Sequence, residues 1–310
     1  MSDPNETEPR SKALRILNLP PLRILIALSI MGVITFVLFS AIPVLSTSLL
    51  SAEATLAFGA LVALFVVGRF IEQRSAEQFG MGAQRGMKSL AVGFLLGAGL
   101  MSTVIGVMAV AGWYRVTGIG GTGDSALISS GSGLPVLILE SAVLFLAVGV
   151  FEEILARGII FRILEEGTGS IIAIVVSSAI FGWGHLNNQN SSPLAVIAIT
   201  VEAGILLSAS YMLVRNLWMP IGLHWAWNLF EGPVFGTSVS GSEFPVLLRA
   251  EVSGPALWTG GAFGPEAGLV ALILGTALGL VMLVMAARRG QMRPFGRKSA
   301  IDVGTLAPQQ

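Results

Sequence analysis

The sequence contains no cysteine and only two histidines, and both shortages narrow its chemistry. Without cysteine there can be no disulfide, no thiol nucleophile and no thiolate ligand for zinc or an iron–sulfur cluster. Charged residues are also scarce, at 12% against about a quarter in soluble domains. The 18 basic and 18 acidic side chains balance, so no overall basic surface favours nucleic acid as a partner. With 54% hydrophobic residues and a mean hydropathy of +0.80, the composition predicts an integral membrane protein, with membrane lipid as its surroundings.

Eight apolar segments approach or exceed the roughly 20 residues that a membrane-spanning helix needs. They cover residues 24–45, 53–71, 89–112, 134–164, 170–186, 194–214, 217–230 and 267–287. The fourth segment is longer than an upright helix requires, and the seventh is short. The sequence therefore predicts an all-α, polytopic membrane protein with about eight transmembrane helices.

The positions of Lys and Arg predict how these helices are oriented, because basic residues collect on the cytoplasmic side. With the N-terminus inside, Arg115 and Arg249 are the only basic residues outside, and Arg157 lies within a span. We expect a cytoplasmic tail at 1–23, a membrane domain at 24–287 and a second cytoplasmic tail at 288–310. The membrane that we expect is a bacterial inner membrane.

Three charged residues interrupt the fourth apolar segment, in the stretch EEILAR that begins at Glu152. A charge at mid-membrane costs roughly 2.5–3.5 kcal/mol on the insertion scale, so it needs a partner or a function. Glu153 and Arg157 are four residues apart and share a helix face, which predicts an ion pair. Glu152 points about 100° away from Glu153 and is therefore the carboxylate that remains free for chemistry.

The two histidines lie in the fifth and seventh segments, each four residues from a helper on the same helix face. His185 follows Phe181, and His224 precedes Asn228. Helix tilt can bring these groups to the level of Glu152 and form one polar pocket. A carboxylate and an imidazole can deprotonate water while a second imidazole and an amide stabilise an oxyanion. The same Glu152, His185 and His224 could instead hold Zn²⁺, and the residues alone leave both routes open.

Other intramembrane chemistries lack their residues. The sequence GTGD at 121–124 matches one aspartyl-protease motif, but no second aspartate lies in a span. No GxSG serine motif stands in a span, and no HExxH zinc motif occurs. Two further acids lie inside spans: Glu140, near the outer end of its helix, and Glu202, at mid-span without an evident partner. Glu202 could support the pocket or bond a neighbouring helix.

Three motifs in this order resemble the CPBP family, also called Abi, which includes eukaryotic CAAX prenyl endopeptidases and bacterial bacteriocin-processing or self-immunity proteins. The motifs are EExxxR at 152–157, FxxxH at 181–185 and HxxxN at 224–228, and the likeness covers about 134–230. The resemblance implies an intramembrane endopeptidase, described as glutamate-dependent though long labelled a metalloprotease, with either no cofactor or zinc.

Roles follow from the resemblance residue by residue. Glu152 would be the general base, and His185 would help to hold or activate the water. The pair His224 and Asn228 would stabilise the oxyanion. Glu153 with Arg157 would brace the site, while Phe181 would line it.

The substrate expected from the resemblance is a membrane-associated peptide or protein, prenylated or bacteriocin-like. Two other functions fit an intramembrane constellation of acids and histidines: a proton-coupled transporter, and a non-catalytic immunity or scaffold protein. The chain has no internal repeat of fixed period, which argues against a transporter built from two related halves.

Overall fold

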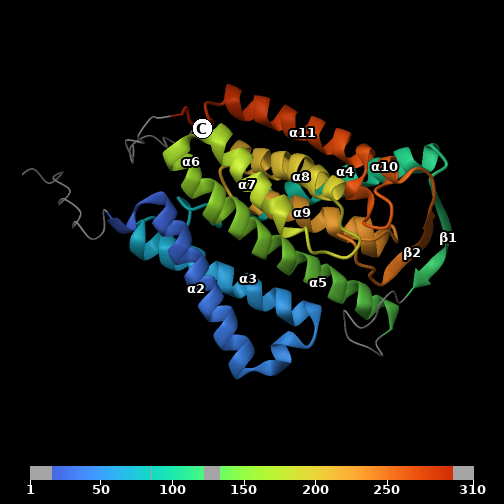
Figure 1. Ribbon diagram of the computed structural model, residues 1–310, viewed down its shortest axis with the longest axis horizontal. Helices are drawn as coiled ribbons and strands as arrows, with labels where there is room; N and C mark the ends of the chain where they lie inside the picture. Colours follow the sequence, from blue (N-terminus) through green and yellow to red (C-terminus); the bar gives the residue numbers. More distant parts are fainter. Residues whose placement is uncertain (1–15, 85, 122–132, 296–310) are drawn as a thin grey trace, which may run out of the picture.

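A computed structural model describes residues 16–84, 86–121 and 133–295 (Figure 1). Most of the predicted tails, and Asp124 of the GTGD sequence, lie outside these residues. The helices that form the body are α2 (Pro20–Ala41), α3 (Leu49–Val66), α4 (Gly86–Val110), α5 (Leu134–Glu153), α6 (Arg162–Thr168), α7 (Ser170–Gly184), α8 (Pro193–Val214), α9 (Trp218–Leu229) and α11 (Leu269–Arg288).

Every predicted span is helical, but the helices differ in length. Among the described residues, six helices are long and apolar enough to cross a membrane. Helices α7 and α9 correspond to the other two predicted spans. The 15 residues of α7 extend about 22 Å, less than the roughly 30 Å of a hydrocarbon core. The structure therefore describes an integral membrane protein with six candidate spans, and the two shorter helices complete the bundle.

Wide π-helical turns extend three of the helices. They are η2 (Val67–Ile71) after α3, η4 (Ile154–Phe161) between α5 and α6, and η5 (Phe230–Val234) after α9. Because η4 joins α5 directly to α6, one continuous helix runs from Leu134 to Thr168. This explains why the fourth apolar segment is longer than an upright span needs.

A small antiparallel sheet corrects the all-α prediction. Strand β1 (Tyr114–Gly121) pairs with β2 (Val246–Val252), with an irregularity between Val116 and Gly118. The strands come from two connections between the predicted spans, 113–133 and 231–266. They lie far apart in the chain, so no local pattern predicts their pairing. In Figure 1 the sheet and α10 (Ala256–Thr259) lie at one end of the molecule, and α6 lies at the opposite end. We call these the sheet end and the α6 end.

Glycines bring α4 and α9 into direct backbone contact. A Cβ atom on Gly93 would lie 2.1 Å from the carbonyl oxygen of Met219, and one on Gly222 would lie 2.1 Å from that of Leu90. Small residues at a crossing allow helix backbones to approach closely inside a membrane. This contact fixes the position of α9, the helix that carries His224.

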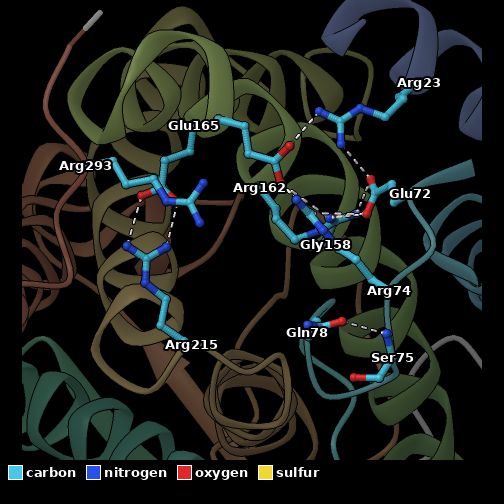
Figure 2. Close-up of polar contacts among 11 residues, drawn as sticks. Arg23, Glu72, Arg74, Ser75, Gln78, Gly158, Arg162, Glu165, Arg215 and Arg293 are labelled. Atoms are coloured by element: carbon cyan, nitrogen blue, oxygen red, sulfur yellow. Dashed lines mark hydrogen bonds and ion pairs between the residues drawn. The ribbon is translucent and has the colours of Figure 1, made fainter. Parts of the chain in front are cut away.

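A cluster of buried charges holds the α6 end together (Figure 2). The Glu72 carboxylate accepts hydrogen bonds from Arg23 at 3.0 Å and from Arg162 at 2.6 and 3.1 Å. Arg74 lies 3.3 Å from the same carboxylate, and Glu166 bonds Arg23 at 2.6 Å. We call these five residues the arginine cluster. It joins the start of α2 to α6 and to the segment after η2.

Electrostatics in the arginine cluster favour the ionised form of Glu72. Burial alone would raise the pKa of this carboxyl, but the guanidinium groups of Arg162, Arg74 and Arg23 outweigh burial and hold the pKa below its usual value. A second group lies beside the cluster in Figure 2, where Glu165 binds Arg215 at 2.6 and 3.1 Å. Both groups place basic side chains at the α6 end.

Candidate active site

The two glutamates of the EExxxR motif end α5, directly before the π-helical segment η4. π-Helical turns are rare and occur frequently at functional sites. Glu153 is completely buried, while the Glu152 side chain is 23% exposed. Glu152 Oε2 has no hydrogen-bond partner among the described residues. The two adjacent carboxylates therefore have different surroundings.

Glu153 connects the first motif to the third. Its Oε1 accepts a hydrogen bond from Arg157 Nη1 at 2.9 Å, the ion pair that the spacing predicts. The same oxygen lies 3.0 Å from His224 Nδ1. Arg157 is fully buried as well, and its Nη2 donates to the carbonyl oxygen of Ala203 on α8 at 3.0 Å. Three helices are joined through these two charged residues.

Phe181 packs among the charged groups. The Arg157 guanidinium carbon lies 4.6 Å from the centroid of its ring, within the range of a cation–π interaction. The Phe181 ring centroid is 5.0 Å from that of His185 and 6.1 Å from that of His224. The ring thus spaces the two imidazoles and covers one face of the buried cation.

Both histidines donate a hydrogen bond from Nδ1, but only His224 contacts two carboxylates. His185 Nδ1 lies 2.9 Å from the carbonyl oxygen of Phe181, which can only accept, so Nδ1 carries the proton and Nε2 is free to accept one. His224 Nδ1 likewise donates to Glu153, and its Nε2 lies 3.9 Å from Glu152 Oε2. Carboxylates on both sides of the His224 ring stabilise positive charge on it, and a doubly protonated ring would present Nε2–H as a donor.

These groups surround one cavity of about 270 Å³. Its polar lining includes Glu53, Glu152, His185, Asn188, Gln189, Glu202, His224, Asn228, Ser240, Ser242 and Glu266. The structure thus brings together five residues of the three motifs, Glu152, Phe181, His185, His224 and Asn228, in one lining. Glu153, Arg157 and Glu140 are not part of this lining.

Three further carboxyls line the cavity. Glu202 on α8 is 2% exposed, and the lack of a side chain at Gly275 on α11 leaves room for it. Sequence reasoning passed over Glu53 and Glu266. Glu53 stands near the start of α3, and Glu266 stands directly before α11. An acid at the outer end of an apolar segment is the only local signal of either residue, and such acids are ordinarily solvated.

Glu266 contacts Glu231, which lies in η5 after α9. The Glu231 Oε1 atom accepts the backbone N–H of Glu266 at 3.1 Å. Burial raises the pKa of both carboxyls, and the pKa of Glu231 stands well above its usual value. For Glu266, this effect of burial on the pKa is opposed by His185, by two hydrogen bonds from Ser240 and by His224.

Within the described part of the chain, no group of three His, Asp or Glu side chains is placed to hold a metal ion. The three ligands considered from the sequence, Glu152, His185 and His224, all line the cavity. Both histidines use Nδ1 in a hydrogen bond, so Nε2 is the ring nitrogen that remains for chemistry in each.

Comparison with known proteins agrees with the motifs. The family model described as Type II CAAX prenyl endopeptidase Rce1-like matches residues 134–230, the stretch that carries all three motifs. The resemblance to the CPBP family is thereby confirmed over this part of the chain. Fold and family match together describe a membrane protein that is similar to CAAX prenyl endopeptidases over the stretch that carries its motifs.

A curated relative supports the same class. The chain is 30% identical over 120 residues to a Bacillus subtilis (strain 168) protein named "Putative membrane peptidase YdiL". The match covers 38% of this chain and 45% of the relative, so it spans less than half of that protein's length. No solved structure matches the chain.

Proposed function

We propose that the protein is an intramembrane endopeptidase that hydrolyses a peptide bond with a water held by Glu152 and His185. The observation that carries this proposal is the shared cavity, whose lining brings together Glu152, the two imidazoles and the Asn228 amide, with Glu152 Oε2 lacking a hydrogen-bond partner among the described residues. Buried ionisable groups in a membrane bundle are costly and mark functional sites.

In the proposed reaction, Glu152 takes one proton from the water while His185 Nε2 accepts a hydrogen bond from the other. The water oxygen attacks the carbonyl carbon, and the oxyanion that forms receives hydrogen bonds from His224 and Asn228. Glu152 then returns its proton to the leaving nitrogen as the C–N bond breaks. Glu153 orients the His224 ring and is itself neutralised by Arg157.

The proposed substrate is a membrane-associated peptide or protein, prenylated or bacteriocin-like, cleaved in a bacterial inner membrane. The proposed orientation places the α6 end in the cytoplasm. Its support is the set of basic side chains at that end, which includes Arg74, Arg215 and Arg293. The sheet end, which carries β1, β2 and α10, would then face outward.

The test is cleavage of a lipidated peptide library by purified protein in lipid nanodiscs. Glu152→Gln and Glu152→Ala should lower the rate by about 10²-fold or more, the range of a general base. Glu140→Gln is the matched control, because it makes the same change on the same helix away from the cavity, and it should cleave as wild type does. Equal rates for wild type and both Glu152 variants would refute the glutamate mechanism.

Two further measurements separate the alternatives. Activity that survives chelation, with no metal found by elemental analysis, supports the mechanism above, whereas activity lost on chelation and restored by Zn²⁺ refutes it. Proton-coupled flux into liposomes that Glu152→Gln abolishes, without proteolysis, would assign a transporter. Immunity that persists in Glu152 and His185 variants would assign a non-catalytic role.

A further inference from the structure

An additional acidic side chain from outside the three motifs lines the cavity. Glu266 stands in the short helix η6 (Pro265–Ala267), is 7% exposed, and shares this lining with both histidines. Positive charge on His185 or His224 would favour the ionised form of Glu266. Glu266 lies beyond the 134–230 stretch that the family model matches, so the family resemblance assigns it no role.

A tight turn holds the Glu266 carboxylate. Ser240 donates both its backbone N–H and its hydroxyl to Glu266 Oε1, each at 2.7 Å. Ser240 has φ +48° and Gly241 has φ +85°, and the flanking Val239 and Ser242 exchange backbone hydrogen bonds at 2.9 Å. Two consecutive positive φ angles are typical of a type I′ turn. A serine in this region is uncommon, and its surroundings must hold it there.

The same turn contacts the segment that follows His185. Asn190 Nδ2 donates to the carbonyl oxygen of Gly241 at 3.3 Å. The approach is so close that a Cβ atom on Gly241 would lie 1.7 Å from the carbonyl oxygen of Gln189. Further back, the Asn188 N–H donates to the His185 carbonyl oxygen at 3.2 Å. Through the turn, the position of Glu266 is tied to the end of α7 that carries His185.

Glu231 fixes Glu266 from the other side. Its carboxyl accepts the Glu266 backbone N–H, and Glu231 itself is fully buried at the end of the helix that carries His224. Burying carboxyl groups is costly unless they are paired or used. Ser240 therefore holds the carboxylate of Glu266, and Glu231 holds its backbone, beside the cavity.

We propose that Glu266 is a positioning residue whose carboxylate stabilises the positive charge that develops on His185 during the reaction, a role that rests on the endopeptidase function proposed above. His185 Nε2 accepts a hydrogen bond from the reacting water, and positive charge then develops on the ring. When the carboxylic acid product ionises, its O–H bond breaks and the proton passes to Nε2, giving a carboxylate and an imidazolium. A fixed carboxylate facing the ring stabilises this charge without having to reorganise.

The decisive variant is Glu266→Gln, which keeps an oxygen acceptor for Ser240 and removes the charge. In nanodiscs, we expect kcat to fall roughly 10- to 100-fold and KM to change less than about twofold. This fall in kcat is no larger than the lower limit of the roughly 10²- to 10⁴-fold effect of a direct acid or base. Glu251→Gln is the matched control, since Glu251 on β2 is exposed and pairs only with Arg115 in the described structure. A wild-type kcat for Glu266→Gln would overturn the proposal.

A double-mutant cycle distinguishes positioning from a structural role. In a His185→Gln background, adding Glu266→Gln should lower the residual rate by less than about twofold, because the group through which Glu266 acts is gone. An equal fractional loss in both backgrounds would show that Glu266 only supports the fold, and would overturn the proposal.

A spectroscopic readout does not depend on activity. The chain has two histidines, so ¹⁵N-histidine labelling of a His224→Gln variant leaves the ring of His185 as the only labelled imidazole. Glu266→Gln should shift its ring nitrogen resonances and Glu251→Gln should not; unchanged resonances would overturn the proposal. Absence of cleavage by the wild-type protein would refute the proposed function, and the resonances would still report whether Glu266 acts on His185.

Discussion

Glu72 is the residue whose loss should most weaken the attachment of α2 to the rest of the bundle. Its carboxylate receives charge-assisted hydrogen bonds from Arg23 and Arg162, and Arg74 lies 3.3 Å away. The side chains of Glu72, Arg23 and Arg162 are 1%, 4% and 5% exposed, so water cannot replace the lost partner. Removing one partner of a buried pair costs about 3–5 kcal/mol, because the remaining charge is left buried.

The assay is unfolding in mixed micelles with increasing SDS, followed by the fluorescence of the six tryptophans. Glu72→Gln should lower the free energy of unfolding by about 3–5 kcal/mol. Glu251→Gln makes the same change at a surface pair whose side chains are 58% and 76% exposed, and it should cost at most about 1 kcal/mol. A Glu72→Gln protein as stable as the Glu251→Gln protein would refute the assignment of the arginine cluster as a clamp.

The ionised state of Glu72 also predicts how the stability of the protein changes with pH. The pKa of Glu72 is lower in the folded protein than the roughly 4.3 of an unperturbed glutamate. Its contribution is therefore fully present above the unfolded pKa and is lost as the pH falls through the folded pKa. Wild type should lose stability below about pH 4.3, and Glu72→Gln should lose less over that range. Parallel curves for the two proteins would contradict the ionised state assigned to Glu72.

Two further predictions concern packing and orientation. Gly93→Ala should destabilise the protein by about 1–3 kcal/mol, because its methyl group would meet the backbone of α9. Gly99→Ala, on the same helix with open space around it, should be neutral or stabilising by up to about 1 kcal/mol. Equal effects of the two substitutions on SDS unfolding would contradict the close crossing of α4 and α9. Because the chain has no cysteine, Ser75→Cys and Ser253→Cys each introduce a single labelling site. A membrane-impermeant maleimide should label Ser75→Cys only from the cytoplasmic side and Ser253→Cys only from the opposite side. The reverse labelling pattern would contradict the proposed orientation.

Hydropathy predicted the helices well because a segment inside the bilayer must be apolar and must hydrogen-bond its own backbone groups, which a helix does. The ion pair between Glu153 and Arg157 was also predictable, since a spacing of four fixes two side chains on one helix face. What the spacing could not reveal is the partner across the bundle. The bond from His224 to Glu153 depends on how α9 packs against α5, and no local period reports that.

The rest of the cavity lining escaped sequence reasoning for a related reason. Glu53 and Glu266 stand at ends of apolar segments, where an acid is ordinarily solvated and needs no explanation. Ser240 reaches Glu266 because a turn adopts two positive φ angles. The Ser-Gly pair indicates a turn, but it does not predict which distant residue the turn contacts. The two-stranded sheet depends in the same way on contacts between segments more than 100 residues apart.

The wide turn of η4 sets the angular relation between the two ends of the long helix. It separates Glu152 and Glu153, which serve the cavity, from Arg162, which serves the arginine cluster. Deleting one residue from Ile154–Phe161 would favour ordinary α-helical bonding there, yet each residue of an α-helix accounts for about 100° of rotation. The shortened helix could then satisfy the cavity or the cluster, but not both. The irregular segment therefore sets the rotation of the helix so that one end contributes to the cavity and the other to the arginine cluster.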